Sequence, residues 1–201
     1  MSRIVAFGCS YTYGHGLTDC FIPPDYAGYE PSKLAYPQLI ADKLNFECVN
    51  KGWCGASNKE IWYNAVNFNY NSDDTIILHW TFPDRTAIIN DDESLQLLAP
   101  WNDNELSETY YKHFHTDTNT NIEFCMMFNH INFLLFRKGF SAINLKPNDN
   151  LYNDLPDWNE FNILDIHLDI LSKEYNSIAL DGTHPGDLAH KKFAEMLLEL
   201  C

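Results

Sequence analysis

A serine, an aspartate and a histidine lie in loops that could meet to form one catalytic group. Ser10 follows the first short apolar run of the chain, and Asp181 and His184 are three residues apart near the carboxyl end. A serine hydroxyl becomes a nucleophile when an imidazole accepts its proton, and a carboxylate orients that imidazole. The loop at 181–185 is short enough to place both of its side chains on one side of a turn. These residue types therefore suggest nucleophilic catalysis by a serine.

Each of these residues taken alone has a simpler explanation. A serine in a glycine-containing loop is usually a turn or cap residue, and a single histidine is more often structural than catalytic. Asp181 could cap the last helix or close an Asx turn. The chain has eight histidines, so a Ser/His pair could occur by chance. The catalytic interpretation depends on the joint pattern, in which each element lies at the end of its own predicted strand.

The elements that must position these loops alternate between strands and helices. Strands are expected over 3–7, 46–49 and 75–80, with helices over 36–44 and 58–68. The order β-α-β-α-β predicts a three-layer α/β/α fold, in which helices cover both faces of a mostly parallel sheet. The continuous apolar run at 4–7 is typical of a strand that is buried on both faces. Ligands of such sheets bind beyond the carboxyl ends of the strands, where these loops meet.

The second half of the chain is less regular. Residues 84–120 have no clear period and look like an insertion with one or two short helices. A nearly all-round apolar helix over 122–138 is expected to be buried in the core rather than to bind a partner. Further elements are a strand over 141–145, an irregular stretch over 146–159, and helices over 163–173 and 188–200. We expect a single domain over 1–201, in which 84–120 and 146–159 form the walls of the pocket.

Three blocks of the sequence resemble those of the SGNH/GDSL hydrolase family. They are Ile4-Val5-Ala6-Phe7-Gly8-Cys9-Ser10-Tyr11-Thr12, then Asn50-Lys51-Gly52-Trp53-Cys54-Gly55-Ala56-Ser57, and finally Asp181-Gly182-Thr183-His184-Pro185. The resemblance implies the SGNH hydrolase fold, with a flavodoxin-like sheet, and the activity of a serine esterase. It also implies that Ser10 attacks the ester, His184 transfers the proton and Asp181 holds the imidazole. The backbone of Gly55 would contribute to the oxyanion hole, and neither a metal nor an organic cofactor is needed.

Two positions depart from the family pattern. Cys9 stands where the first block usually has Asp. The third block is usually Gly-x-Asn-Asp, and the best register puts His79 at the glycine and Thr81 at the asparagine, whose side chain donates into the oxyanion hole. A threonine hydroxyl can donate one hydrogen bond, and losing such a donor typically lowers the rate by about 10²–10³. Thr81 could therefore replace the asparagine or simply end its strand. Arg85 could shape the rim of the pocket or pair with an acidic residue.

Because Thr81 stands where the family has asparagine, a second function is also possible. A catalytically impaired binding or structural module would have the same fold without turnover. A nucleotide-binding protein with this order of elements would need a phosphate-binding glycine motif, and neither GxxxxGK[ST] nor GxGxxG occurs in the chain.

The composition excludes several other classes. The chain has 201 residues, with 13 Lys and Arg against 28 Asp and Glu, and a net charge of −15. Without a basic stripe, such a chain is not expected to bind nucleic acid or an anionic membrane. The six cysteines include no CxxC pair, which disfavours a zinc site. We see no signal peptide or transmembrane segment, and expect a cytoplasmic or virion-associated protein.

The net charge also bears on the expected partner. A negative surface does not attract acidic substrates, so we expect a neutral small-molecule or carbohydrate ester, unless the pocket has a local charge of its own. The aromatic residues of the two irregular segments, Trp101, Tyr110, Tyr111, Tyr152 and Trp158, could stack on a sugar or cover the core. The sequence does not indicate an oligomeric state.

Overall fold

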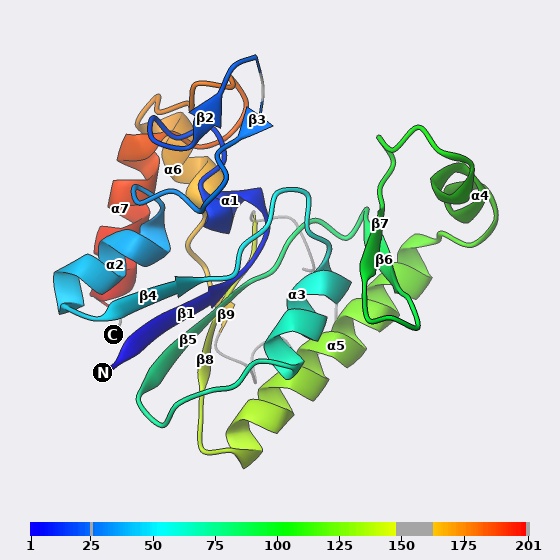
Figure 1. The fold of residues 1–201 in the computed structure, drawn as a ribbon, viewed down its shortest axis with the longest axis horizontal. Coiled ribbons are helices and arrows are strands. Elements are labelled where there is room, and N and C mark those ends of the chain that lie inside the picture. Colours follow the sequence, from blue (N-terminus) through cyan, green and yellow to red (C-terminus); the bar gives the residue numbers. More distant parts are fainter. Residues whose placement is uncertain (25, 148–162, 200–201) are drawn as a thin grey trace.

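A parallel five-stranded sheet forms the centre of the computed structural model, which describes residues 1–24, 26–147 and 163–199 (Figure 1). The strands are β1 (Arg3–Phe7), β4 (Glu47–Asn50), β5 (Asp74–His79), β8 (Ala142–Leu145) and β9 (Ile163–Leu164). They are arranged in the order β4-β1-β5-β8-β9, and each neighbouring pair is parallel. This is the flavodoxin-like strand order. The predicted parallel sheet is confirmed.

Helices cover both faces of this sheet (Figure 1). One layer contains α2 (Tyr36–Leu44), α6 (Leu168–Glu174) and α7 (Asp187–Leu198), and the other contains α3 (Asn58–Val66) and α5 (Asp117–Arg137). The alternation of side chains along β1 supplies both cores, because Ile4 and Ala6 belong to the first and Val5 and Phe7 to the second. Burial on both faces explains the continuous apolar run of β1, and the three-layer α/β/α architecture is confirmed.

The segment over 84–120 contains more regular structure than expected. It forms a hairpin of β6 (Thr86–Ile89) and β7 (Leu95–Leu98), followed by α4 (Glu105–His113), and α5 begins before the segment ends. We expected only one or two short helices there. The strands are four residues long, and their turn contains Glu93 with a φ of 65°, so the hydrophobic alternation is too short to stand out. The hairpin contacts α3 through β6.

Two other expectations about the second half need correction. The helix expected over 163–173 begins only at Leu168, because its first two residues form the edge strand β9. The long helix α5 is not buried all round, since Phe128 and Leu135 lie in the core whereas Phe133 and Phe136 are 58% and 75% exposed. Its buried face packs in the core with α3 and the sheet. Most of the irregular stretch over 146–159, with Tyr152 and Trp158, lies outside the described residues.

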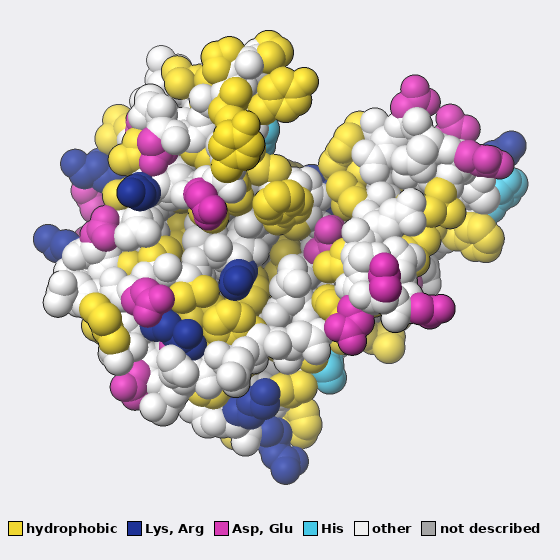
Figure 2. Space-filling view, in the orientation of Figure 1, with side chains coloured by type: hydrophobic (Ala, Val, Ile, Leu, Met, Phe, Trp, Pro, Cys, Tyr) yellow, Lys and Arg dark blue, Asp and Glu magenta, His cyan; other side chains and the backbone are white. Residues whose placement is uncertain are grey.

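The amino-terminal region adds three short elements to this frame. The helix α1 (Ser10–Tyr13) follows β1 directly, and residues 18–32 contain the two-residue strands β2 (Phe21–Ile22) and β3 (Tyr26–Ala27). On the face shown in Figure 2, acidic side chains are scattered over the surface, and Lys and Arg occur singly or in small groups. Within the described part of the chain, no helix has the length and apolar character needed to cross a membrane.

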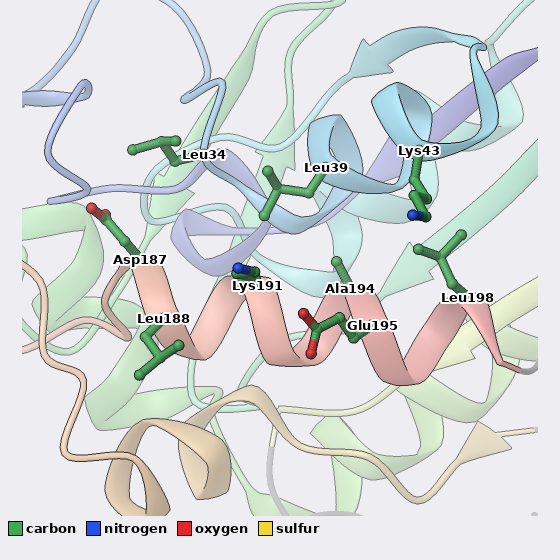
Figure 3. A pocket seen from close by; sticks show the side chains of 9 residues that line it. All are labelled: Leu34, Leu39, Lys43, Asp187, Leu188, Lys191, Ala194, Glu195 and Leu198. Carbon is green, nitrogen blue, oxygen red and sulfur yellow. The ribbon is translucent and has the colours of Figure 1, made fainter.

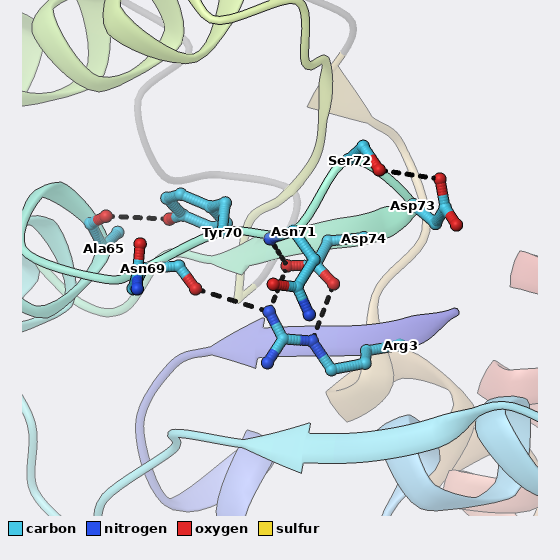
Figure 4. A network of polar contacts seen from close by, with 8 residues as sticks. All are labelled: Arg3, Ala65, Asn69, Tyr70, Asn71, Ser72, Asp73 and Asp74. Atoms are coloured by element: carbon cyan, nitrogen blue, oxygen red, sulfur yellow. Dashed lines mark hydrogen bonds and ion pairs between the residues drawn. The ribbon is translucent and has the colours of Figure 1, made fainter. Parts of the chain in front are cut away.

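A partly buried ion pair joins the starts of β1 and β5 (Figure 4). Arg3 donates from Nε to Asp74 Oδ1 over 2.7 Å and from Nη2 to Asp74 Oδ2 over 2.6 Å, and the Asp74 side chain has no exposed surface. Burial by itself would raise the pKa of Asp74, but the hydrogen bonds from Arg3 and from the backbone N–H of Asn71 outweigh it and lower this pKa below its ordinary value. The carboxylate therefore stabilises the folded state in its ionised form.

We expect Asp74→Asn to lower the free energy of unfolding by about 1–3 kcal/mol at pH 7, because it removes the negative charge and leaves only one side-chain oxygen to accept from Arg3. Since the folded pKa of Asp74 is depressed, its contribution is present above about pH 4 and is lost as the pH falls through that pKa. Urea unfolding at pH 7 and pH 3 measures the difference. Asp73→Asn is the control, because Asp73 is exposed and bonds only to the Ser72 hydroxyl among the described contacts. Equal effects of the two variants would contradict this account.

Candidate active site

Ser10 is held by a tight turn between β1 and α1. It is the first residue of α1 and is 8% exposed. The turn needs a glycine at position 8, because a Cβ there would lie 2.0 Å from Thr12 Oγ1. In parallel sheets of this order the ligand site lies at the point where the strand connections diverge, which is beside β1. The chain thus presents the Ser10 hydroxyl at the carboxyl edge of the sheet.

The structure brings Ser10, His184 and Asp181 together. Ser10 Oγ lies 2.9 Å from His184 Nε2, and the other ring nitrogen, Nδ1, contacts Asp181 Oδ2 in a very short hydrogen bond. Asp181 Oδ1 accepts hydrogen bonds from the backbone N–H groups of Thr183, at 2.9 Å, and of His184, at 3.0 Å. This Asx-type turn sets the aspartate against the histidine three residues later. The arrangement can move a proton from the serine to the imidazole.

Asp181 is suited to remain ionised beside the imidazole. Its side chain is 1% exposed, whereas that of His184 is 22% exposed. Burial alone would raise the pKa of Asp181, but the two backbone N–H groups and the contact with His184 outweigh it and lower this pKa below its ordinary value. A fixed negative charge at this position favours the protonated imidazole that forms when the serine loses its proton.

Gly16 packs closely against the Asp181 side chain and was not identified from the sequence as part of this site. It has a φ of +82°, and a Cβ there would lie 2.8 Å from Asp181 Cγ. Its carbonyl also accepts a hydrogen bond of 2.8 Å from the backbone N–H of Leu180. The signal that could have found it is the pair of glycines at 14 and 16, so soon after the serine.

One group of possible metal ligands occurs in residues 1–24, 26–147 and 163–199. Ligand atoms of His15, Asp181 and His184 lie within 4.8 Å of one another, and the rings of the two histidines are 4.7 Å apart. Two of these three residues already bond to each other, and His184 also contacts Ser10. The cluster therefore overlaps the Ser10–His184–Asp181 group.

The second loop, after β4, is tied to the helix that carries Ser10. Asn50 donates from Nδ2 to the carbonyl of Thr12 at 2.7 Å, and its Oδ1 accepts from the N–H of Gly52 at 2.9 Å. Gly55 then takes a φ of +81°, where a Cβ would lie 3.4 Å from Leu97 of β7. The role of Gly55 in an oxyanion hole stays a prediction. Helix α3 begins with a capping box, in which Ser57 is the N-cap and Glu60 its partner.

Thr81 follows β5 and has no exposed surface. Its backbone is held by Asn58, whose Oδ1 accepts from Thr81 N at 2.8 Å and whose Nδ2 donates to Thr81 O at 3.1 Å. Its hydroxyl accepts a very short hydrogen bond from Arg85 Nη2. Sequence reasoning did not single out Asn58, and its place at the first turn of α3 offered no signal of a contact so far along the chain. The role of Thr81 as a donor also stays a prediction.

Two pockets among the described residues lie away from this group. A groove of about 500 Å³ runs between α2 and α7, with Leu39, Leu188 and Leu198 among its lining residues (Figure 3). A second pocket, of about 460 Å³, has Tyr29 and Trp53 at its wall. Neither is lined by a member of the Ser10–His184–Asp181 group.

The similarity of this chain to known proteins is a similarity of fold. No protein-family model matches the sequence, and no curated protein matches it. The structure is similar to that of a protein assigned to the lipolytic G-D-S-L family from Desulfitobacterium hafniense, with a TM-score of 0.57, 13% identity and coverage of 99% of both chains. It is also similar to an inhibitor-bound aryl esterase of M. smegmatis, with a TM-score of 0.57, 11% identity and coverage of 100% and 98%.

A third similar structure is an acetyl xylan esterase from Butyrivibrio proteoclasticus. The TM-score is 0.52 and the identity is 15%, and the match covers 98% of this chain and 62% of that one. Together these likenesses show that the chain has the fold of the SGNH/GDSL hydrolases, as its three sequence blocks indicated.

Proposed function

We propose that this protein is a serine hydrolase that cleaves carboxylic esters through Ser10, His184 and Asp181. The observation that carries the proposal is the 2.9 Å contact between Ser10 Oγ and His184 Nε2, with Asp181 bound to the other ring nitrogen. This is the geometry that makes a serine hydroxyl nucleophilic. The fold shared with lipolytic proteins and esterases supports the same activity.

The proposed reaction has two halves. Ser10 Oγ attacks the ester carbonyl while its proton moves to His184 Nε2, and the imidazole then gives this proton to the departing alcohol. Water attacks the resulting acyl-serine with His184 again as the base, which releases the acid and restores Ser10. Asp181 holds the imidazole throughout. The backbone N–H groups of Ser10 and Gly55 would stabilise the oxyanion of each tetrahedral intermediate.

We propose short acyl or acetyl esters as the substrates, including those carried on a carbohydrate. Trp101, 55% exposed, lies next to Arg85 and could stack on a sugar ring. The acetyl xylan esterase with this fold acts on an acetylated carbohydrate, as its name states. We extend that substrate class to this chain as part of the proposal.

Covalent labelling tests the proposed nucleophile without any assumption about the substrate. In a fluorophosphonate probe, Ser10 Oγ would attack phosphorus and displace fluoride, so peptide mass spectrometry should find the added mass on Ser10. Ser10→Ala should abolish labelling, while Ser72→Ala, at an exposed serine, should leave it unchanged. If the wild-type protein is neither labelled nor able to hydrolyse p-nitrophenyl acetate, the impaired binding or structural module becomes the better description.

A further inference from the structure

Thr81, the residue expected to supply a third oxyanion donor, is fully buried. A donor must lie about 2.7–3.1 Å from the oxyanion, so its hydrogen has to face the bound substrate. Thr81 has no exposed surface, and its hydroxyl accepts a hydrogen bond from Arg85 Nη2. A guanidinium cannot accept a hydrogen bond, so the direction of this contact is settled. Arg85 is therefore the charged donor that contacts the Thr81 side chain.

Arg85 has donors that its structural contacts do not use. Its Nη2 bonds to Thr81, whereas its Nε is buried without a hydrogen-bond partner. None of the acidic side chains in the described residues forms an ion pair with it, although the chain has 28 Asp and Glu. A partly buried guanidinium without a carboxylate is costly and favours a negative charge beside it.

Two aromatic rings hold this guanidinium in place. The Arg85 Cζ atom lies 5.8 Å from the centre of the Phe82 ring and 5.3 Å from the ring of Trp101, which follows β7. Cation–π contacts of this kind offset part of the cost of an unpaired charge. The hairpin β6–β7 and the end of β5 thus fix the cation from two sides.

A short series of ring contacts connects Arg85 to the catalytic histidine. The Phe82 ring lies 6.3 Å from that of Tyr11, and the Tyr11 ring lies 6.0 Å from that of His184. Burial raises the pKa of Tyr11 to about 12, and the positive charge of Arg85 opposes this rise. Tyr11 is the residue after Ser10, so these ring contacts lie between Arg85 and the Ser10–His184–Asp181 group.

We propose that Arg85 is a further catalytic residue, whose guanidinium donates a hydrogen bond to the oxyanion in place of the family's asparagine side chain. This assignment rests on the proposed ester hydrolysis. A threonine side chain is shorter than that of asparagine, so the Arg85 Nη2 that bonds to its hydroxyl would be the donor in its place. Thr81 acts as a positioning residue for Arg85. A charged donor stabilises a developing negative charge more than a neutral amide does, because the electrostatic attraction is stronger.

A substrate carboxylate is the other negative charge that this guanidinium could bind. In that case the loss of Arg85 would raise KM for esters that carry a carboxylate and would spare neutral esters. An oxyanion donor acts on every ester, and its loss lowers kcat rather than raising KM. Two substrates therefore separate the roles, p-nitrophenyl acetate and the mono-p-nitrophenyl ester of succinic acid.

The test measures kcat and KM for both esters in Arg85→Met, Arg85→Lys and Thr81→Val. We expect Arg85→Met to lower kcat by about 10²–10³ on both esters with little change in KM, and Arg85→Lys to lose less because it keeps the charge. Thr81→Val should cost less than Arg85→Met. Arg137→Met is the matched control, since Arg137 is exposed on α5 and also lies over a phenylalanine ring. Its kcat should equal that of the wild type.

Chemical rescue separates a catalytic role from a structural one. Guanidinium ion at a concentration below its denaturing range should restore part of kcat in Arg85→Ala and leave the wild type unchanged. Unchanged kcat in Arg85→Met, or a loss confined to KM of the succinate ester, would overturn the assignment while ester hydrolysis stands. A wild-type protein that neither hydrolyses nor is labelled at Ser10 would overturn the proposed function, and the role of Arg85 with it.

Discussion

Replacing Ser10 with alanine is expected to lower kcat for p-nitrophenyl acetate by about 10⁶-fold, the size of effect that loss of the nucleophile has in serine hydrolases. Ser10 Oγ is the only atom of the group that would form a bond to the acyl carbon, and His184 cannot replace it because its role is to accept the proton. Initial rates at saturating substrate measure this loss. Wild-type protein should also show a burst of p-nitrophenol, which Ser10→Ala should lack.

The fold should tolerate this substitution. Ser10 loses one hydroxyl in a site where its partner, His184, is 22% exposed and can be solvated. The midpoint of thermal unfolding should therefore remain close to that of the wild type. Ser72→Ala serves as the control for activity, since Ser72 is exposed and bonds only to its neighbour Asp73 among the described contacts. Wild-type turnover in Ser10→Ala would refute this nucleophile.

If the proposed mechanism holds, Asp181→Asn is expected to lower kcat by about 10⁴-fold, as the same change does in known Ser-His-Asp enzymes. The Asp181 Oδ1 acceptor for two backbone N–H groups would be kept by the asparagine oxygen, so the amide NH₂ would face His184 Nδ1. The imidazole would then have its proton on Nε2, where it cannot accept one from Ser10. The fold would be retained with the wrong tautomer of the base.

The control for this prediction is another Asp–His pair in the same chain. Asp165 Oδ1 lies 3.0 Å from His167 Nε2, away from Ser10 in the sequence, and its side chain is 83% exposed. Asp165→Asn should leave kcat unchanged. Because the pKa of Asp181 is lowered, its carboxylate is ionised above about pH 4, and the ratio of wild-type to Asp181→Asn kcat should be maintained from pH 6 to pH 8. A ratio near unity would remove Asp181 from the proposed mechanism.

Much of the fold could be predicted from short stretches of sequence. The apolar run of β1 and the hydrophobic periodicity of α2, α3 and α7 are local patterns, and each can be recognised within one element. The hairpin β6–β7 and the strand β9 were missed because two to four residues cannot establish a period. The exposure of Phe133 and Phe136 on α5 was missed for another reason, since an apolar helix does not say on how many sides it will be covered.

The sequence by itself singled out the three residues that we propose to be catalytic. Asp181 and His184 are three positions apart in one turn, and Ser10 lies at the end of a strand whose edge of the sheet is set by the parallel β-α-β order. Only the tertiary structure showed that the Arg85 guanidinium contacts the Thr81 side chain. Arg85 is placed there by Phe82 and by Trp101, which a hairpin carries back to the end of β5. Local turns and strand ends follow from short-range rules, whereas the position of a long side chain depends on the packing of segments that are distant in the chain.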